Sequence, residues 1–134
     1  YGQMAWKLRQ DPRVTVIERT NIRHMPEDRL SCRVDLAVID VSFISLRIVV
    51  PAAARFLRPG GTMVCLVKPQ FEVGKGKVGK GGVVRDPSLH QAVLLELAGF
   101  FSDLGFACSA PLPSPIVGPK GNKEFLIRLD LPLM

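Results

Sequence analysis

Cysteine and histidine are scarce in this chain of 134 residues, which has three cysteines and two histidines. The cysteines lie far apart and show neither a disulfide framework nor the spacing of metal ligands. The histidines lack ligand partners at metal spacing, so we expect no metal site. Reduced thiols are typical of cytoplasmic proteins, and we expect that localisation. The residues concerned are Cys32, Cys65, Cys108, His24 and His90.

Long uncharged runs are also lacking. The longest, which includes residues 106–119, contains four prolines and therefore does not predict a membrane-spanning helix. No signal peptide opens the chain, and no internal repeat is present. We therefore expect no membrane partner.

The composition is that of a folded protein with a basic surface. Hydrophobic residues make up 47% of the chain and charged residues 22%, which is typical of one globular domain. The net charge of +6 favours a polyanionic partner such as nucleic acid. Proteins that bind no nucleic acid also have basic surfaces, so the charge alone leaves both interpretations open.

Apolar runs alternate with helical patterns along most of the chain. The runs that predict strands are residues 14–17, 34–39, 62–67, 106–110 and 125–131. The segments that predict helices are residues 2–8, the stretch from Ser42 or Ser45 to Leu57 with a kink or restart at Pro51, and the stretch from Asp86 to Gly105. This order predicts an α/β fold with a mostly parallel sheet and right-handed crossovers. Only a loop joins the last two strands, so they should form an antiparallel pair at the sheet edge.

Ionisable side chains stand where three of these strands meet loops. Asp40 and Lys68 follow the carboxyl ends of two parallel strands, and ligands bind at that edge of such sheets. If the last strand is antiparallel, Glu124 at its amino end lies on the same edge. Each residue alone is better explained as a solvated strand end or a helix cap. Together they predict an acid/base site that acts on a hydroxyl.

A glycine-rich basic loop, residues 74–82, follows Lys68. It nearly matches a phosphate-binding P-loop, but Gly81 stands where the metal-binding Ser or Thr is needed. The loop favours either contacts with an RNA backbone or a solvated surface, and the sequence leaves both open. A second basic cluster, from Arg19 to Arg33, is better explained as a solvated face. Asn21 after the first strand has two readings, a cofactor contact or a turn residue.

The stretches ERTNIRH, DVSFISL, KPQFEVG, GGVVRD and SPIVGPKGNKEF resemble the TlyA-type rRNA 2′-O-methyltransferases, some of which are named haemolysins. They belong to the wider FtsJ/RrmJ-like group of S-adenosylmethionine-dependent enzymes with a Rossmann-like fold. In that family a Lys-Asp-Lys-Glu tetrad forms the site, and the resemblance places its last three members at Asp40, Lys68 and Glu124. It also implies that Glu18, Asn21, Ile22 and Asp40 lie near the cofactor. For RNA we expect contacts from Lys75, Lys77, Lys80, Arg85, Lys120 and Lys123.

The chain also departs from the family pattern. The first tetrad lysine, the glycine-rich cofactor loop, the acidic ribose ligand and the RNA-binding S4 module have no equivalent in it. The resemblance therefore implies the carboxyl-terminal part of a methyltransferase domain, spanning residues 1–134. The whole protein would transfer a methyl group from S-adenosylmethionine to a cytidine 2′-hydroxyl in ribosomal RNA. These residues alone are expected to be inactive.

The sequence leaves two alternative functions to compare with methyl transfer. A non-catalytic RNA-binding domain would use the basic loop and the net charge of +6, and would bind RNA in a salt-dependent way without methyl transfer. Membrane lysis, which the haemolysin name implies, would need an amphipathic or spanning segment, and the sequence shows none.

Overall fold

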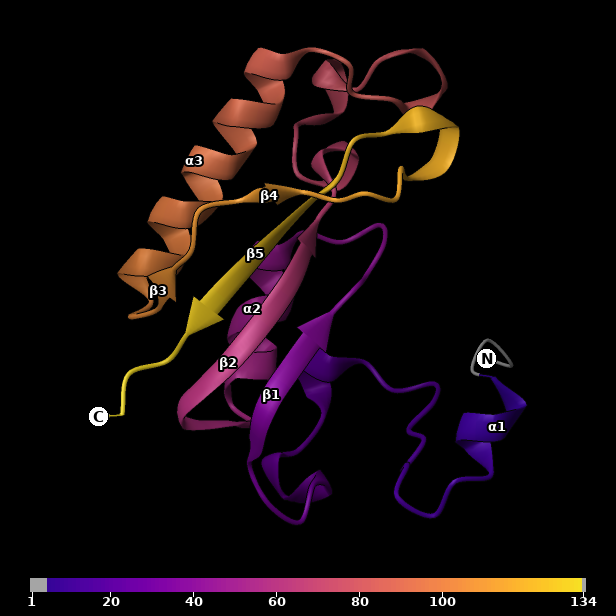
Figure 1. Ribbon diagram of the computed structural model, residues 1–134, viewed down its shortest axis with the longest axis vertical. Helices are drawn as coiled ribbons and strands as arrows, with labels where there is room; N and C mark the ends of the chain where they lie inside the picture. Colours follow the sequence, from indigo (N-terminus) through magenta and orange to yellow (C-terminus); the bar gives the residue numbers. More distant parts are fainter. Residues whose placement is uncertain (1–4, 134) are drawn as a thin grey trace.

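The computed structural model describes residues 5–133 of the chain, apart from the side chains of Lys75 and Lys80. The described helices are α1 (Trp6–Arg9), α2 (Leu46–Ala54) and α3 (Pro87–Asp103). The strands are β1 (Val34–Ile39), β2 (Leu57–Val67), β3 (Ala107–Cys108), β4 (Leu112–Pro113) and β5 (Phe125–Asp130). Figure 1 shows the sheet at the centre and α1 set apart from it. The first residues of the predicted helix over 2–8 lie outside the described part.

The strands form one mixed sheet. Its order is β1-β2-β5-β3, and β4 also pairs with β5. The pair β1–β2 is parallel, and β5 runs antiparallel to β2, β3 and β4. The predicted antiparallel pairing of the last strands is thus confirmed. The short strands β3 and β4 form the edge, while β5 lies between them and β2.

Two details of the strands differ from prediction. Residues 14–17 form no strand, because a β-branched run becomes one only where a neighbour completes its hydrogen bonds. Strand β2 begins at Leu57, five residues before the predicted start at residue 62, and it includes Pro59, Gly60 and Gly61, a sequence typical of a turn. Its register against β1 shifts between Val34 and Leu36, and Gly60 has a φ of +80° within this irregularity. Glycine tolerates that conformation, so the strand continues through the turn signal.

The predicted caps at Ser45 and Asp86 and the stop at Gly105 are confirmed, whereas the helix predicted to reach Leu57 ends at Ala54 and runs as one helix through Pro51. The Ser45 hydroxyl accepts from the Arg47 N–H at 3.0 Å and caps α2, which contains Pro51. Asp86 caps α3 through the Ser88 N–H at 2.9 Å. Gly105 follows α3 with a φ of +100°, a conformation that ends helices and favours glycine.

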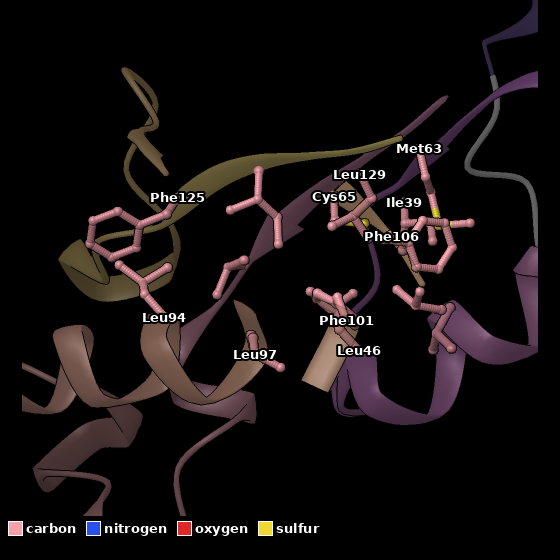
Figure 2. Close-up of a cluster of buried hydrophobic side chains, with 14 of the residues drawn as sticks. Ile39, Leu46, Met63, Cys65, Leu94, Leu97, Phe101, Phe106, Phe125 and Leu129 are labelled. Carbon is pink, nitrogen blue, oxygen red and sulfur yellow. The ribbon is translucent and has the colours of Figure 1, made fainter. Parts of the chain in front are cut away.

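The core lies between the sheet and the two longer helices. Alternate residues of β2, such as Met63 and Cys65, are buried toward the helices. Figure 2 shows Leu46 of α2 with Leu97 and Phe101 of α3 on the same side of the sheet. The opposite face of β2 is only half-buried. Because side chains alternate along a strand, residues of even number in β2 and β5 point to this open face.

Candidate functional site

The carboxyl edge of the β1–β2 pair brings the three predicted side chains together. Ile39 pairs with Cys65, and Val67 pairs with Phe125, so the residue beyond each strand end lies next to the others. Asp40, Lys68 and Glu124 line one cavity of about 320 Å³. The expected convergence is confirmed, while the catalytic role of these residues stays a prediction.

Lys68 is held by two oxygen atoms. Its Nζ lies 2.7 Å from Asp40 Oδ1 and donates to Ser42 Oγ at 3.1 Å. The Lys68 side chain is 13% exposed, whereas that of Asp40 is 64% exposed. An ammonium group has three N–H donors, so one remains for a ligand in the cavity. The sequence marked Ser42 only as a possible helix start and not as a site residue.

Glu124 lies deeper than the other two and is 5% exposed. Its Oε2 accepts from Gln70 Nε2 at 3.1 Å. Gly118 packs against the same carboxylate so closely that a Cβ atom there would overlap Oε2. Gln70 and Gly118 were not predicted as site residues, because their contacts to Glu124 depend on how two loops meet.

A second, largely apolar cavity of about 400 Å³ lies on the other side of Asp40. Ile22, Val34, Ile39 and Val41 are among its walls, and Asp40 lines it as well. Of the four residues expected near a cofactor, Ile22 and Asp40 are therefore at this cavity. Glu18 and Asn21 are not among the described residues that line it.

Asn21 and Glu18 have other contacts. The Asn21 side chain accepts from the Arg23 N–H at 3.0 Å and caps a single 3-10 turn, which matches its reading as a turn residue. Glu18 Oε1 accepts from Arg9 at 2.9 Å.

Two aromatic rings form a platform beside the Lys68 cavity. Phe43 is 88% exposed and has a φ of +65°, which is unusual for a residue with a large side chain. Its ring centroid lies 4.8 Å from that of Phe71. Both residues line a cavity of about 270 Å³ that shares Gln70 and Phe71 with the Lys68 cavity. Exposed aromatics held in a strained conformation are typical of binding sites, and the sequence alone did not mark them.

The basic residues expected to bind RNA surround these cavities. Figure 1 shows the glycine-rich basic loop beside the segment that precedes β5, above the carboxyl end of β2. Lys77, Arg85, Lys120 and Lys123 are exposed. None of these four forms an ion pair with a carboxylate in the described part of the chain. The side chains of Lys75 and Lys80 lie outside the description.

Glu72 links the loop after β2 to the start of α2. Its carboxylate accepts from Ser45 Oγ at 2.6 Å and from the Leu46 N–H at 2.9 Å. Burial raises the pKa of Glu72, and the hydrogen bonds from Ser45 and Leu46 oppose that rise. This contact fixes α2 relative to the stretch that carries Gln70 and Phe71.

The described residues contain neither a group of side chains that could hold a metal ion nor a helix that could cross a membrane. No group of three or more metal-ligating side chains that could hold a metal ion occurs among residues 5–133. In the same part of the chain, no helix has both the length and the apolar character needed to span a bilayer.

Comparison with known proteins gives the family. TlyA of Mycobacterium tuberculosis, a 16S/23S rRNA (cytidine-2′-O)-methyltransferase, is 50% identical over 129 residues, which are 96% of this chain and 48% of that protein. YqxC of Bacillus subtilis, which carries an rRNA methyltransferase name, is 50% identical over 133 residues, or 98% of this chain and 47% of its own length. A hemolysin-named structure from Streptococcus thermophilus matches with a TM-score of 0.92 at 45% identity, covering 98% of this chain and 48% of that one.

The chain therefore spans about half the length of the relatives it matches. A family model described as FtsJ-like methyltransferase matches residues 1–131. This match and the mixed sheet confirm the Rossmann-like α/β class expected from the sequence. Because the match covers nearly all of its residues, the chain belongs to the FtsJ-like methyltransferase family.

Proposed function

We propose that the whole protein methylates a ribose 2′-hydroxyl of cytidine in ribosomal RNA, with S-adenosylmethionine as the methyl donor. The observation that carries this proposal is the position of the Asp40–Lys68 pair. Asp40 lines both the apolar cavity and the polar one, and Lys68 lies 2.7 Å from it at the wall of the polar cavity. Donor and acceptor bound in the two cavities would meet beside this pair.

The apolar cavity suits the donor. Its walls are mainly aliphatic, which fits an adenine ring, and its volume of about 400 Å³ is that of a small-molecule site. Asp40, the one charged side chain among the described lining residues, is an acceptor for the positive or hydroxyl-bearing part of such a ligand. When bound, S-adenosylmethionine supplies an electrophilic methyl group.

The polar cavity suits the acceptor hydroxyl. Asp40 and Ser42 fix the Lys68 ammonium, so its remaining N–H is directed by two hydrogen bonds rather than free to rotate. A donor held in this way stabilises the negative charge that develops on the hydroxyl oxygen as its proton passes to the Asp40 carboxylate, which lines the same cavity. Neutral Lys68 would instead accept the proton itself. Holding oxygen and methyl group in line supplies much of the acceleration in either case.

Glu124 would assist this chemistry through its negative charge, without contacting the reacting hydroxyl. Its carboxylate is buried and receives a hydrogen bond from Gln70, so it adds negative charge to the cavity that contains Lys68. That charge attracts the ammonium group of Lys68 and offsets the cost of its burial. Asp40 and Glu124 would thus hold Lys68 in position and balance its charge.

The surface around the site suits single-stranded RNA. The exposed ring of Phe43 would stack on an unpaired base, a contact that is common in RNA recognition. The exposed cations Lys77, Arg85, Lys120 and Lys123 would contact phosphates. We include Lys75 and Lys80 in this role because they belong to the same loop. An rRNA or ribosomal-subunit substrate implies a cytoplasmic location and no membrane partner.

The test uses Lys68 variants of the whole protein with labelled cofactor. Lys68→Ala should abolish methyl transfer and leave cofactor binding largely intact. Lys68→Arg should also fail, because a guanidinium stays protonated and is shaped differently. Lys7→Ala is the matched control, because Lys7 is an exposed lysine outside the two cavities, and this variant should transfer normally. Near-normal transfer by either Lys68 variant would remove Lys68 from this role.

The same experiment separates the proposal from a non-catalytic RNA-binding function. In that case the wild-type protein would bind RNA with strong salt dependence and transfer no methyl group. The Lys68 variants would then bind RNA as the wild type does.

A further inference from the structure

Two loops that are distant in sequence meet at the rim of the site, and Asn122 joins them. One is the end of the glycine-rich basic loop with the residues that follow it, up to Val84. The other is the turn of residues 118–122, which precedes Glu124. Asn122 is 3% exposed, which is unusual for a loop asparagine.

All hydrogen-bonding groups of the Asn122 amide face this junction. Its Oδ1 accepts from the Val84 N–H at 2.9 Å. Its Nδ2 donates to the carbonyl oxygens of Gly82 at 3.0 Å and Pro119 at 3.1 Å. The amide orientation is fixed, because a backbone N–H must face the oxygen and carbonyls must face the NH₂ group. Aspartate has nearly the same shape but cannot make the two donor contacts.

The same turn forms the wall against Glu124. The Asn122 carbonyl accepts from the Gly118 N–H at 2.7 Å and closes the turn. Gly118 in turn packs against the Glu124 carboxylate, leaving no room for a Cβ atom. The Ser114 N–H donates to the Glu124 carbonyl at 2.8 Å. A shift of this turn would therefore move the Glu124 carboxylate.

The loop side of the junction is also anchored. The His90 ring of α3 makes a 2.8 Å hydrogen bond with the Val84 carbonyl. The Gly79 N–H donates to the Val83 carbonyl at 2.8 Å. The Lys120 side chain lies over Gly81, since a Cβ there would be 3.9 Å from Lys120 Nζ. The two loops thus form one unit that presents exposed Lys77 and Lys120 on its surface.

We propose that Asn122 is a positioning residue that ties the glycine-rich basic loop to the turn that holds Glu124. This inference rests on the proposed function, because it assigns Asn122 a role through Glu124. In consequence, the placement of the Glu124 carboxylate depends on order in the loop expected to contact RNA. Loss of the amide disturbs the chemical step more than it disturbs cofactor binding.

The kinetic test is a double-mutant cycle in the whole protein. Asn122→Ala should lower kcat roughly 10- to 100-fold, because displacements near 1 Å at a catalytic group have effects of that size. KM for the cofactor should stay within about twofold of wild type, since Asn122 lies outside the apolar cavity. Asn122→Asp should fail as well, which covers the case in which the alanine variant does not fold.

The cycle partner is Glu124→Gln. If Asn122 acts through Glu124, then Asn122→Ala should have almost no further effect on kcat in the Glu124→Gln background. Thr62→Val is the matched control, because it removes a 2.7 Å hydrogen bond to Asp130 at the other end of the same strand pair. It should leave kcat unchanged. Independent, additive effects of the Asn122 and Glu124 variants would overturn the proposal.

A second measurement, amide hydrogen exchange without substrate, is independent of activity. In Asn122→Ala, exchange should become faster both at Val84 with its neighbours and in the 118–122 turn, and in Thr62→Val it should change in neither. Faster exchange in the turn alone would show that the loops are not coupled and would overturn the inference. If Glu124→Gln itself leaves kcat unchanged, the role of Glu124 in the proposed function fails. The coupling of the two loops is then decided by the exchange result alone.

Discussion

Replacing Gly118 with alanine tests the geometry of the site most directly. The backbone there has φ −76° and ψ −173°, which alanine adopts without strain. The new Cβ would lie 2.7 Å from Glu124 Cδ and 3.3 Å from the Asn122 carbonyl oxygen, and it would overlap Glu124 Oε2. Carbon atoms in contact are separated by about 3.5–4.0 Å, so carboxylate and turn must separate by about 1 Å.

The expected cost follows from that overlap. Forcing extra atoms into a packed site destabilises proteins by about 1–3 kcal/mol. Urea m-values of small domains are about 1–3 kcal/mol per molar, so the unfolding midpoint should fall by roughly 1 M. A displacement of about 1 Å at Glu124 should also lower kcat of the whole protein by up to about 100-fold.

Gly74→Ala is the matched control. Gly74 has φ −64° and ψ 157°, and a Cβ there would meet no atom within 4 Å. This substitution should be neutral or should stabilise by about 0.4–1 kcal/mol, because alanine has less freedom in the unfolded chain. Both variants are compared by urea unfolding, alone and with Glu124→Ala, which removes the obstacle. The predicted overlap is absent if Gly118→Ala is as stable as Gly74→Ala, or if Glu124→Ala does not relieve the loss of stability.

Three further predictions concern other parts of the chain. Burial raises the pKa of Glu72 above its ordinary value near 4.5, so the free energy of unfolding should fall as pH rises through that raised pKa. In Glu72→Gln, urea unfolding at several pH values should show a weaker pH dependence. Phe43→Gly should be more stable than Phe43→Ala by about 1 kcal/mol, because φ is +65° there, while both lose RNA affinity in filter binding. Residues 1–134 alone should bind S-adenosylmethionine weakly, because they span about half the length of the relatives and Asp40 is the only polar side chain among the described residues that line the apolar cavity. Micromolar binding in calorimetry would contradict this.

The position of the three site residues was predictable because it follows from local rules. A strand end, the order of the elements and the two-residue period of a strand together place Asp40, Lys68 and Glu124 on one edge and one face. Helix caps at Ser45 and Asp86 are likewise set by neighbours two residues away. None of these inferences needs knowledge of how distant loops pack.

The contacts that hold the site were not predictable in the same way. Gln70 lies 54 residues from Glu124, and Asn122 lies 38 residues from Val84. Nothing in the local sequence indicates such pairings, although an asparagine between glycine and lysine is a turn signal. The backbone conformation of Phe43 was equally hidden, because its left-handed φ is imposed by the surrounding structure. The strand predicted over residues 14–17 was wrong for the opposite reason. The local sequence favours a strand, but no neighbouring strand pairs with it.

The Asp40–Lys68 pair contributes little to folding stability, and its place at the cavity wall is the better explanation for it. With Asp40 64% exposed, the pair resembles a surface ion pair, and such pairs contribute about 0–1 kcal/mol. The desolvation of Lys68, whose side chain is 13% exposed, opposes even this small contribution. A fold that needed only stability would be served as well by an apolar side chain at the end of β2. The ammonium instead lies at the wall of a cavity, next to a carboxylate shared with a second cavity, which is the placement that the proposed reaction at a hydroxyl requires.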